Sequence, residues 1–298
     1  MRILSILAAT LIGTLQVALL FGQNEPFLWR GVDGEPIPFE DSAAIEDFLQ
    51  TARVGDVKGI DKGVTNPRKL LLEKNGIHMH AIFRSVDLFK AIWRTSEGIK
   101  LDYRDSCRYE FAAYKLSKLL EIERVPPVVR RTFRPEDFEN GRDYERLGGT
   151  PEGTVEAWVE GAMTEMERRK NGQLPPDTLQ WAAEYQRMYL FDSLTFNDDR
   201  NLGNILIGPE WKIWLIDSTR SFRPYRELRE PEKIKRCDAR VWARLLQLTP
   251  ETLRRELGDI LEPKVLDCLI SRHQALVEHI RGLLDKRGEK VVLLGPRP

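Results

Sequence analysis

The stretch FNDDRNLGNILIGPEWKIWLID, residues 196–217, decides how this chain is interpreted. Aspartates and asparagines crowd its first part. Two apolar, strand-like runs follow, joined by Gly208-Pro209, and the second run ends on Asp217. A turn pair between two β-type runs predicts a hairpin. The stretch therefore places acidic and amide side chains at both ends of a predicted hairpin.

This arrangement suits phosphoryl transfer, which needs a carboxylate near the attacking hydroxyl and oxygen ligands for a divalent cation. Asp199 and Asn204 are five residues apart, the spacing of the Asp and Asn in the kinase catalytic loop. A hairpin from Asn204 to Asp217 would bring these two side chains together. They would then bind one or two metal ions while Asp199 faces the acceptor.

Each short piece of the stretch also fits an ordinary structural role. An Asp and an Asn at this spacing carry little information alone. Asp199-Arg200 suits a surface pair, and Asp217 suits the cap of a strand. The complete order of helix, polar loop, two apolar strands and a final Asp is more demanding, and it favours a catalytic site.

Composition sets the broad class. The chain has 298 residues, enough for one large domain or two lobes. Lys plus Arg and Asp plus Glu are both 46, so no net charge favours nucleic acid as a partner. The three cysteines show no metal-binding spacing and argue against a disulfide scaffold, although one bridge stays open. The four histidines form no zinc motif.

The N-terminus has a different character. After Met1-Arg2, residues 3–22 form an apolar run of 20 residues without a charge. Such a run fits a cleaved signal peptide over 1–23 and equally an uncleaved signal-anchor. Either would make the rest of the chain extracytoplasmic or secretory, with membrane contact only through 3–22. A buried N-terminal helix is the alternative.

Patterns along the rest of the chain predict a β-rich part followed by a helical part. Asn75-Gly76 marks a hairpin within 69–86, 105–120 is an amphipathic helix, and Thr249-Pro250 starts another helix. The other predictions are a short helix near 43–52, strands at 125–133 and 154–161, a loop at 134–153, a linker at 163–178, and helices at 179–194 and 267–286.

We therefore expect an α+β protein with two lobes and a cleft between them. The expected parts are an N-terminal extension (24–54), an N-lobe with hinge (55–161), a helical C-lobe (162–290) and a tail (291–298).

Several segments resemble atypical kinases. DRNLGN (199–204) and WLIDS (214–218) resemble the catalytic and metal-binding segments of phosphatidylinositol 3/4-kinase-like enzymes, and the layout is similar to HipA-type and Golgi casein kinases. YEFAAYKLSKLLEIERVPPVV (109–129) and EAWVEG (156–161) resemble the helix and hinge of bacterial members. The resemblance covers about residues 55–285 and implies a protein-kinase-like fold.

The resemblance also implies roles for single residues. Asp199 would orient or deprotonate the acceptor hydroxyl, and Asn204 and Asp217 would hold Mg²⁺ or Mn²⁺, with ATP as co-substrate. Glu110 would pair with the phosphate-binding cation. The other implied contacts are with adenine, from Trp158, Val159 and Glu160, and with the phosphates, from a loop containing Gly59 and Gly63.

Two positions depart from the pattern. Asn201 stands where those enzymes have a histidine, and it cannot carry a proton. Arg84 stands where a phosphate-binding lysine is expected. Its guanidinium is bulkier and planar, and it is not interchangeable with lysine as a phosphate ligand. Arg84 as a solvent-facing strand residue, and Glu110 as a helix-surface acid, are the alternatives. Substitute cations would be Lys58, Lys62, Lys74 and Lys90.

The leading hypothesis is an ATP- and Mg²⁺-dependent phosphotransferase that acts on a protein, lipid or sugar hydroxyl. The alternative, motivated by Arg84 and Asn201, is a weakly active or inactive pseudokinase that serves as a nucleotide-binding or scaffolding module. A structural envelope protein without nucleotide binding is a third hypothesis. The Arg-rich region 223–244 also contains acids, which favours a solvated mixed-charge surface over an acceptor site.

Overall fold

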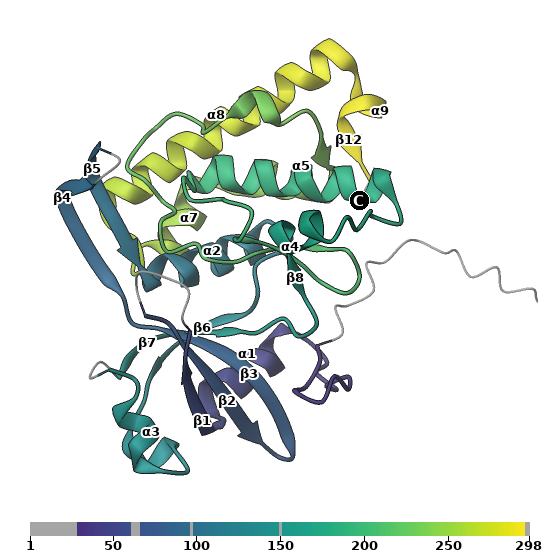
Figure 1. Cartoon of the computed structure of the whole chain (residues 1–298). Helices are drawn as coiled ribbons and strands as arrows, with labels where there is room; N and C mark the ends of the chain where they lie inside the picture. The colour runs from purple at the N-terminus through teal and green to yellow at the C-terminus, as the bar shows by residue number, and fades with distance from the viewer. Residues whose placement is uncertain (1–28, 61–65, 96–97, 149–150, 296–298) are drawn as a thin grey trace, which may run out of the picture.

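The computed structural model describes residues 29–60, 66–95, 98–148 and 151–295. The apolar stretch 3–22 and Gly63 lie outside these residues, so the predictions made for them concern undescribed parts of the chain. Among the described residues, no helix is both long and apolar enough to cross a membrane. Figure 1 shows two lobes, with a sheet in the lower one and most of the helices in the upper one.

The N-terminal lobe is built on an antiparallel five-stranded sheet in the order β1-β2-β3-β7-β6. At the predicted hairpin, Asn75 and Gly76 have φ values of 53° and 77°, the left-handed conformation of a two-residue hairpin turn. The hairpin prediction is therefore confirmed. The strands are β1 (Arg53–Gly59), β2 (Arg68–Lys74), β3 (Ile77–Arg84), β6 (Val128–Thr132) and β7 (Glu152–Ala157).

The two faces of this sheet border different hydrophobic cores, because side chains alternate along a strand. Phe83 belongs to the core that α1 (Ser42–Thr51) covers. Val128 belongs to a second core, shared with α2 (Cys107–Leu119) and the C-terminal lobe. Glu156 lies opposite Val128 in the register, so this buried acid is on the α2 side of the sheet.

A two-stranded ribbon, β4 (Asp87–Thr95) and β5 (Gly98–Ser106), separates β3 from α2 and is absent from the sequence prediction. It forms a sheet of its own (Figure 1). Its last residue, Ser106, caps α2 by accepting a hydrogen bond from the Arg108 amide at 3.3 Å. The helix predicted from Asp105 therefore begins two residues later, at Cys107.

The C-terminal lobe is mainly helical, with α5 (Thr178–Thr195) packed against α8 (Pro263–Arg287). Thr249 caps α7 through a hydrogen bond from the Thr252 amide to its hydroxyl, as the Thr-Pro pair predicts. The other elements of this lobe are α6 (Ala239–Gln247), α7 (Pro250–Leu257), α9 (Glu289–Val292), β11 (Cys237–Asp238), β12 (Leu293–Leu294) and a 3-10 turn (Pro231–Lys233).

The stretch 163–178, predicted as a linker, contains ordered structure. β8 (Met163–Thr164) pairs with the hairpin of β9 (Ile205–Ile207) and β10 (Ile213–Leu215) in a three-stranded sheet. α4 (Glu165–Lys170) follows, capped reciprocally by Thr164 and Glu167. The linker prediction was wrong because this local capping pattern was overlooked.

The predicted loop at 134–153 also contains short helical turns, Pro135–Asp137 and α3 (Gly141–Glu145), and the start of β7. All three cysteines are buried and free, so no disulfide forms. The structure as a whole confirms the predicted α+β fold with two lobes, β-rich first and helical second (Figure 1).

Candidate active site

The loop that follows α5 is shaped by its own side chains. Phe196 is left-handed, with φ of 50°, and turns the chain out of the helix. The Asn197 side chain accepts a hydrogen bond from the Asp199 amide at 3.0 Å, and the Asn201 side chain accepts one from the Gly203 amide at 2.8 Å. Such bonds stabilise turns in place of regular structure. They fix the backbone on both sides of Asp199.

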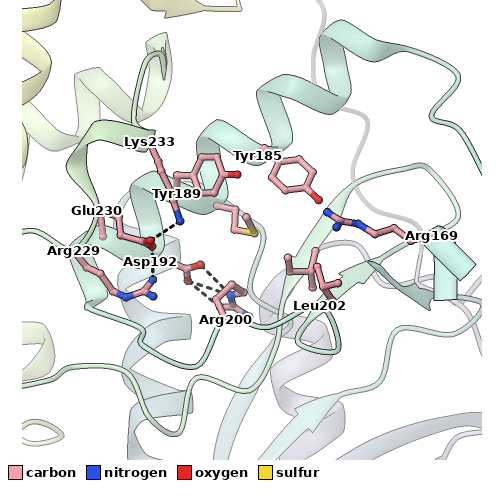
Figure 2. A pocket seen from close by; sticks show the side chains of 12 residues that line it. Arg169, Tyr185, Tyr189, Asp192, Arg200, Leu202, Arg229, Glu230 and Lys233 are labelled. Atoms are coloured by element: carbon pink, nitrogen blue, oxygen red, sulfur yellow. Dashed lines mark hydrogen bonds and ion pairs between the residues drawn. The ribbon is translucent and has the colours of Figure 1, made fainter. Parts of the chain in front are cut away.

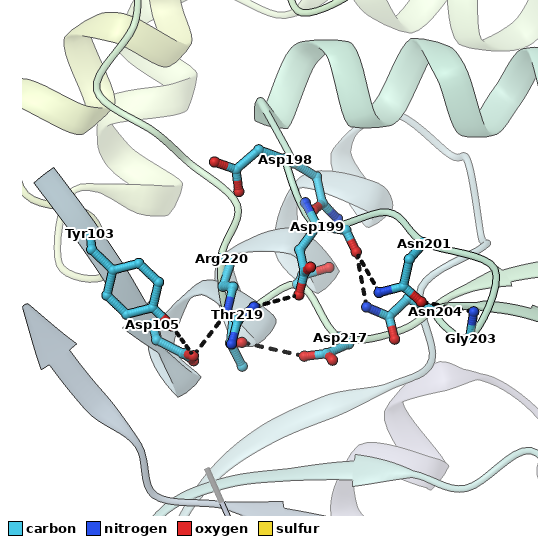
Figure 3. A network of polar contacts seen from close by, with 12 residues as sticks. Tyr103, Asp105, Asp198, Asp199, Asn201, Gly203, Asn204, Asp217, Thr219 and Arg220 are labelled. Atoms are coloured by element: carbon cyan, nitrogen blue, oxygen red, sulfur yellow. Dashed lines mark hydrogen bonds and ion pairs between the residues drawn. The ribbon is translucent and has the colours of Figure 1, made fainter. Parts of the chain in front are cut away.

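Asn204 and Asp217 bracket the β9–β10 hairpin, whose register pairs Ile205 with Leu215. The Asn204 side chain donates through Nδ2 to the backbone carbonyl of Asp199 at 3.0 Å, so its side-chain oxygen, Oδ1, is the atom that can bind a cation. Asp217 is left-handed, with φ of 57°, and accepts from the Thr219 hydroxyl at 3.3 Å (Figure 3). The hairpin thus returns the chain from one candidate ligand to the other.

The donor atoms suit a hard divalent cation, because Mg²⁺ and Mn²⁺ prefer carboxylate and carbonyl oxygens. Across the described parts of the chain, no three His, Cys, Asp or Glu side chains are arranged to hold a metal ion. An ion at Asn204 and Asp217 would therefore have few protein ligands. That is the usual situation for Mg²⁺, which takes its other ligands from substrate phosphates and water.

Arg200 connects the backbone at the two ends of the hairpin, beside the two candidate ligands. It donates to both carboxylate oxygens of Asp192, at 3.0 Å each, and these side chains are 4% and 5% exposed. It also donates to the carbonyls of Asn204 and Ile216, at 2.6 and 2.7 Å. One buried cation therefore holds the backbone at Asn204 and just before Asp217. The surface pair of Asp199 with Arg200, one alternative from the sequence, is not formed.

Figure 2 shows Arg200 and Asp192 at the edge of a pocket of about 200 Å³. Its other labelled lining residues are Arg169, Tyr185, Tyr189, Leu202, Arg229, Glu230 and Lys233, and Glu230 pairs with both Arg229 and Lys233. The cations of this pocket therefore have carboxylate partners within the protein.

Asp199, the candidate base, is 30% exposed and contacts Arg220. The Arg220 guanidinium donates to Asp199 Oδ2 at 3.0 Å. Burial raises the pKa of Asp199, and the positive charge of Arg220 opposes this rise. Sequence reasoning did not single out Arg220, because an arginine three residues after Asp217 has no distinguishing pattern.

Arg84 and Glu110 lie together in the interior. Arg84 Nη1 is 3.7 Å from Glu110 Oε1, and the two side chains are 10% and 0% exposed. The alternatives of a solvent-facing Arg84 and a surface Glu110 are therefore wrong. Glu110 also accepts a hydrogen bond from the Ser218 amide at 2.9 Å, which ties α2 to the residue after Asp217.

Glu156 of β7 is a second carboxylate at Arg84, with Oε2 3.5 Å from Nη1. Burial raises the pKa of Glu110 to about 8, against the lowering effect of Arg84, and burial raises the pKa of Glu156 in the same way. Sequence reasoning missed this role of Glu156. The available signal was a charged residue inside the otherwise apolar strand TVEAWV.

The predicted hinge residues follow β7. The Trp158 amide donates to the His80 carbonyl at 3.1 Å, and Lys69 Nζ lies 4.0 Å from the Trp158 ring centroid. Glu160 pairs with the His80 side chain. Val159 is buried in the N-terminal core, so its backbone groups, rather than its side chain, are available for a contact with adenine.

Gly59 ends β1 opposite Arg68, and the loop that follows, with Gly63, is outside the described residues. Lys62 lies in the same undescribed loop. Three other candidate cations have partners of their own: Lys58 pairs with Asp56, Lys74 with Asp47, and Lys90 lies over the Trp93 ring.

The sequence matches no protein-family model and has no significant match among curated proteins. Solved structures do match. Hydra Fam20 with sugar aligns with a TM-score of 0.60 at 14% identity, over 86% of this chain and 93% of that chain. The Golgi casein kinase structure gives 0.60 at 15%, over 86% and 78%. The same kinase with Mn/ADP bound gives 0.60 at 15%, over 86% and 80%.

Of the groups that the sequence resembles, these matches support the Golgi casein kinase group and lend no support to the phosphatidylinositol 3/4-kinase-like or HipA-type groupings. Identities this low establish architecture alone. The chain therefore has the kinase-like fold of the Fam20 and Golgi casein kinase structures.

Proposed function

We propose that this protein is a phosphotransferase that moves the terminal phosphoryl group of ATP to an alcohol acceptor, with Mg²⁺ or Mn²⁺ bound. One observation carries the proposal. The β9–β10 hairpin returns the chain so that Asn204 and Asp217 bracket it, and the Asn204 side chain donates to the backbone carbonyl of Asp199. A carboxylate that meets the acceptor hydroxyl and oxygen ligands that hold the cation are two of the parts that phosphoryl transfer uses.

The residues have distinct tasks in this proposal. Asp199 accepts the proton of the attacking hydroxyl and orients its oxygen. Asn204 and Asp217 hold the cation, which when bound neutralises charge on the phosphate oxygens. Arg84, kept in place by Glu110 and Glu156, faces the phosphates from the N-terminal lobe.

Nucleotide binding is supported by the hinge and by one neighbour. Trp158 and Glu160 follow the strand that pairs with β3, which is where a kinase-like fold holds adenine. The Golgi casein kinase structure contains Mn and ADP. The acceptor class stays broad in this proposal: a protein, lipid or sugar hydroxyl.

A pseudokinase is the second candidate, and specific observations favour it. Arg84 is shared between two buried carboxylates, so its charge is already compensated before any phosphate arrives. Among the described residues, Asn201 hydrogen bonds only within its own loop, and its side chain cannot carry a proton. Such a protein would bind nucleotide without turning it over.

Thermal melting with and without ATP and Mn²⁺ tests the binding step. We expect stabilisation that needs both ligands, because a ligand that binds only the folded state raises its stability. Asp217→Asn should abolish the shift while leaving the unliganded melt nearly unchanged. Asp285→Asn, an exposed helix position, is the matched control. An equal shift in Asp217→Asn would refute the metal assignment.

Turnover separates the two candidates. An active enzyme should release ADP from ATP, and Asp199→Asn should stop this release while the nucleotide-dependent thermal shift persists. A wild-type chain that shows the shift but no ADP release is a pseudokinase.

A further inference from the structure

Arg220 lies between two carboxylates from different parts of the fold. Its Nη1 donates to Asp199 Oδ2 at 3.0 Å, and its Nε donates to Asp105 Oδ2 at 3.0 Å (Figure 3). Asp199 belongs to the loop after α5, whereas Asp105 is near the end of β5 in the ribbon. The guanidinium therefore connects the candidate base to the β4–β5 ribbon.

Asp105 is the more deeply buried of the two carboxylates. Asp105 is 1% exposed and also accepts a hydrogen bond from the Tyr103 hydroxyl at 3.0 Å. The Tyr103 ring lies 5.6 Å from the Arg220 guanidinium carbon, within the range of a cation–π contact. The Ser106 amide donates to the Thr219 carbonyl at 2.9 Å, which holds the two backbones side by side.

This geometry has a consequence for Asp199. Its Oδ2 is held by Arg220, which restricts rotation of the carboxylate and leaves Oδ1 for the proton of the acceptor. A planar guanidinium can hold two carboxylates along fixed directions, whereas a lysine ammonium is a flexible point charge. Asp105, held in turn by Tyr103, keeps the guanidinium from following Asp199 if that side chain moves.

We propose that Arg220 is a positioning residue for Asp199 and that Asp105, on the inserted ribbon, is its anchor. The inference rests on the proposed phosphotransferase function and extends it to the ribbon. The ribbon thereby contributes to turnover although neither of its strands joins the five-stranded sheet of the N-terminal lobe.

Hydrolysis of ATP by the full chain tests this without a known acceptor. Water takes the acceptor's place: its proton passes to Asp199, its oxygen bonds to the terminal phosphorus, and the bond to the bridging oxygen breaks with its electron pair leaving on ADP. The variants are Arg220→Gln, Arg220→Lys, Asp105→Asn and the double variant Asp105→Asn with Arg220→Gln. Arg226→Gln, an exposed position on the same segment, is the control.

Arg220→Gln should lower kcat by about 100-fold, the effect of a misplacement of about 1 Å at a reacting group. The Kd for ADP with Mn²⁺ should stay within about twofold, since no contact to nucleotide is removed. Arg220→Lys should fail to restore kcat. Asp105→Asn should lower kcat less, and the double variant should equal Arg220→Gln, because Asp105 acts only through Arg220.

Wild-type kcat in Arg220→Gln would overturn the positioning role, and so would a loss of kcat that parallels losses in ADP affinity and in the unliganded melting temperature. Additive losses in the double variant would overturn the role of Asp105 as anchor. A wild-type chain that hydrolyses no ATP refutes turnover in the proposed function, and the positioning role with it. The failures of the positioning role and of the anchor can be told apart from a failure of the proposed function, because they are seen while the wild-type chain is active.

Discussion

Asp192→Asn offers a test of how the loop is held, because it removes the charge that compensates Arg200. Both side chains are almost fully buried, and Arg200 would keep its charge without a carboxylate partner. Breaking a buried ion pair by removing one member typically costs about 3–5 kcal/mol. At about 2–4 °C per kcal/mol for a protein of somewhat smaller size, we expect the melting temperature to fall by roughly 10 °C.

A double variant, Asp192→Leu with Arg200→Met, separates stability from function. Replacing both members of a buried ion pair by apolar residues is often neutral or stabilising, so the melting temperature should recover. The hydrogen bonds from Arg200 to the carbonyls of Asn204 and Ile216 are nevertheless lost. At about 1.5 kcal/mol or more for each charged hydrogen bond, affinity for ADP with Mn²⁺ should fall by at least about tenfold.

The assays are thermal unfolding without ligand and calorimetric binding of ADP with Mn²⁺. Asp259→Asn is the matched control, since its pair with Arg130 is largely exposed and such pairs contribute about 0–1 kcal/mol. The reasoning is refuted if Asp192→Asn melts within about 2 °C of the wild type. It is also refuted if the stable double variant binds nucleotide as the wild type does.

Two further predictions concern stability. Gly153→Ala should lower the melting temperature by several degrees, because the added Cβ would lie 2.2 Å from the Arg84 carbonyl oxygen and overpacking costs about 1–3 kcal/mol; Gly282→Ala, with nothing within 4 Å, should not lower it, and equal melts would contradict this. Burial lowers the pKa of His273, whose ring contacts the Leu245 carbonyl, so the neutral form stabilises the fold. This contribution is complete above about pH 6.5 and is lost as the pH falls. Denaturant unfolding at pH 7.5 and 5.5 should show a smaller pH dependence for His273→Gln than for the wild type, and an equal dependence would exclude this role.

Local patterns in the sequence were sufficient for several elements. Asn75-Gly76 predicts its hairpin because only a few residue types adopt two successive left-handed conformations easily. The helix at 107–119 follows from its apolar spacing. The β4–β5 ribbon was missed because adjacent apolar residues, Leu88-Phe89 and Ile92-Trp93, interrupt the alternation in β4 that marks a strand, and the alternation of Ile99, Leu101 and Tyr103 with charged residues in β5 was overlooked.

Part of the candidate site could likewise be predicted from the sequence. The spacing of Asp199, Asn204 and Asp217 around a predicted hairpin was visible in the sequence, since a hairpin returns the chain to its starting point. Their roles stay predictions until the binding and turnover experiments are made.

The charge partners of the site were decided only by the tertiary structure. Arg84 meets Glu156, and Arg220 meets Asp105, across 72 and 115 residues of chain. No local pattern encodes such pairs, because a buried charge takes whichever opposite charge the packing of distant elements brings within reach. The sequence by itself determined the turns, the helix periods and the residues of the loop, each of which depends on near neighbours. Burial depends on the whole fold, and which buried charges pair with each other therefore depends on the tertiary structure.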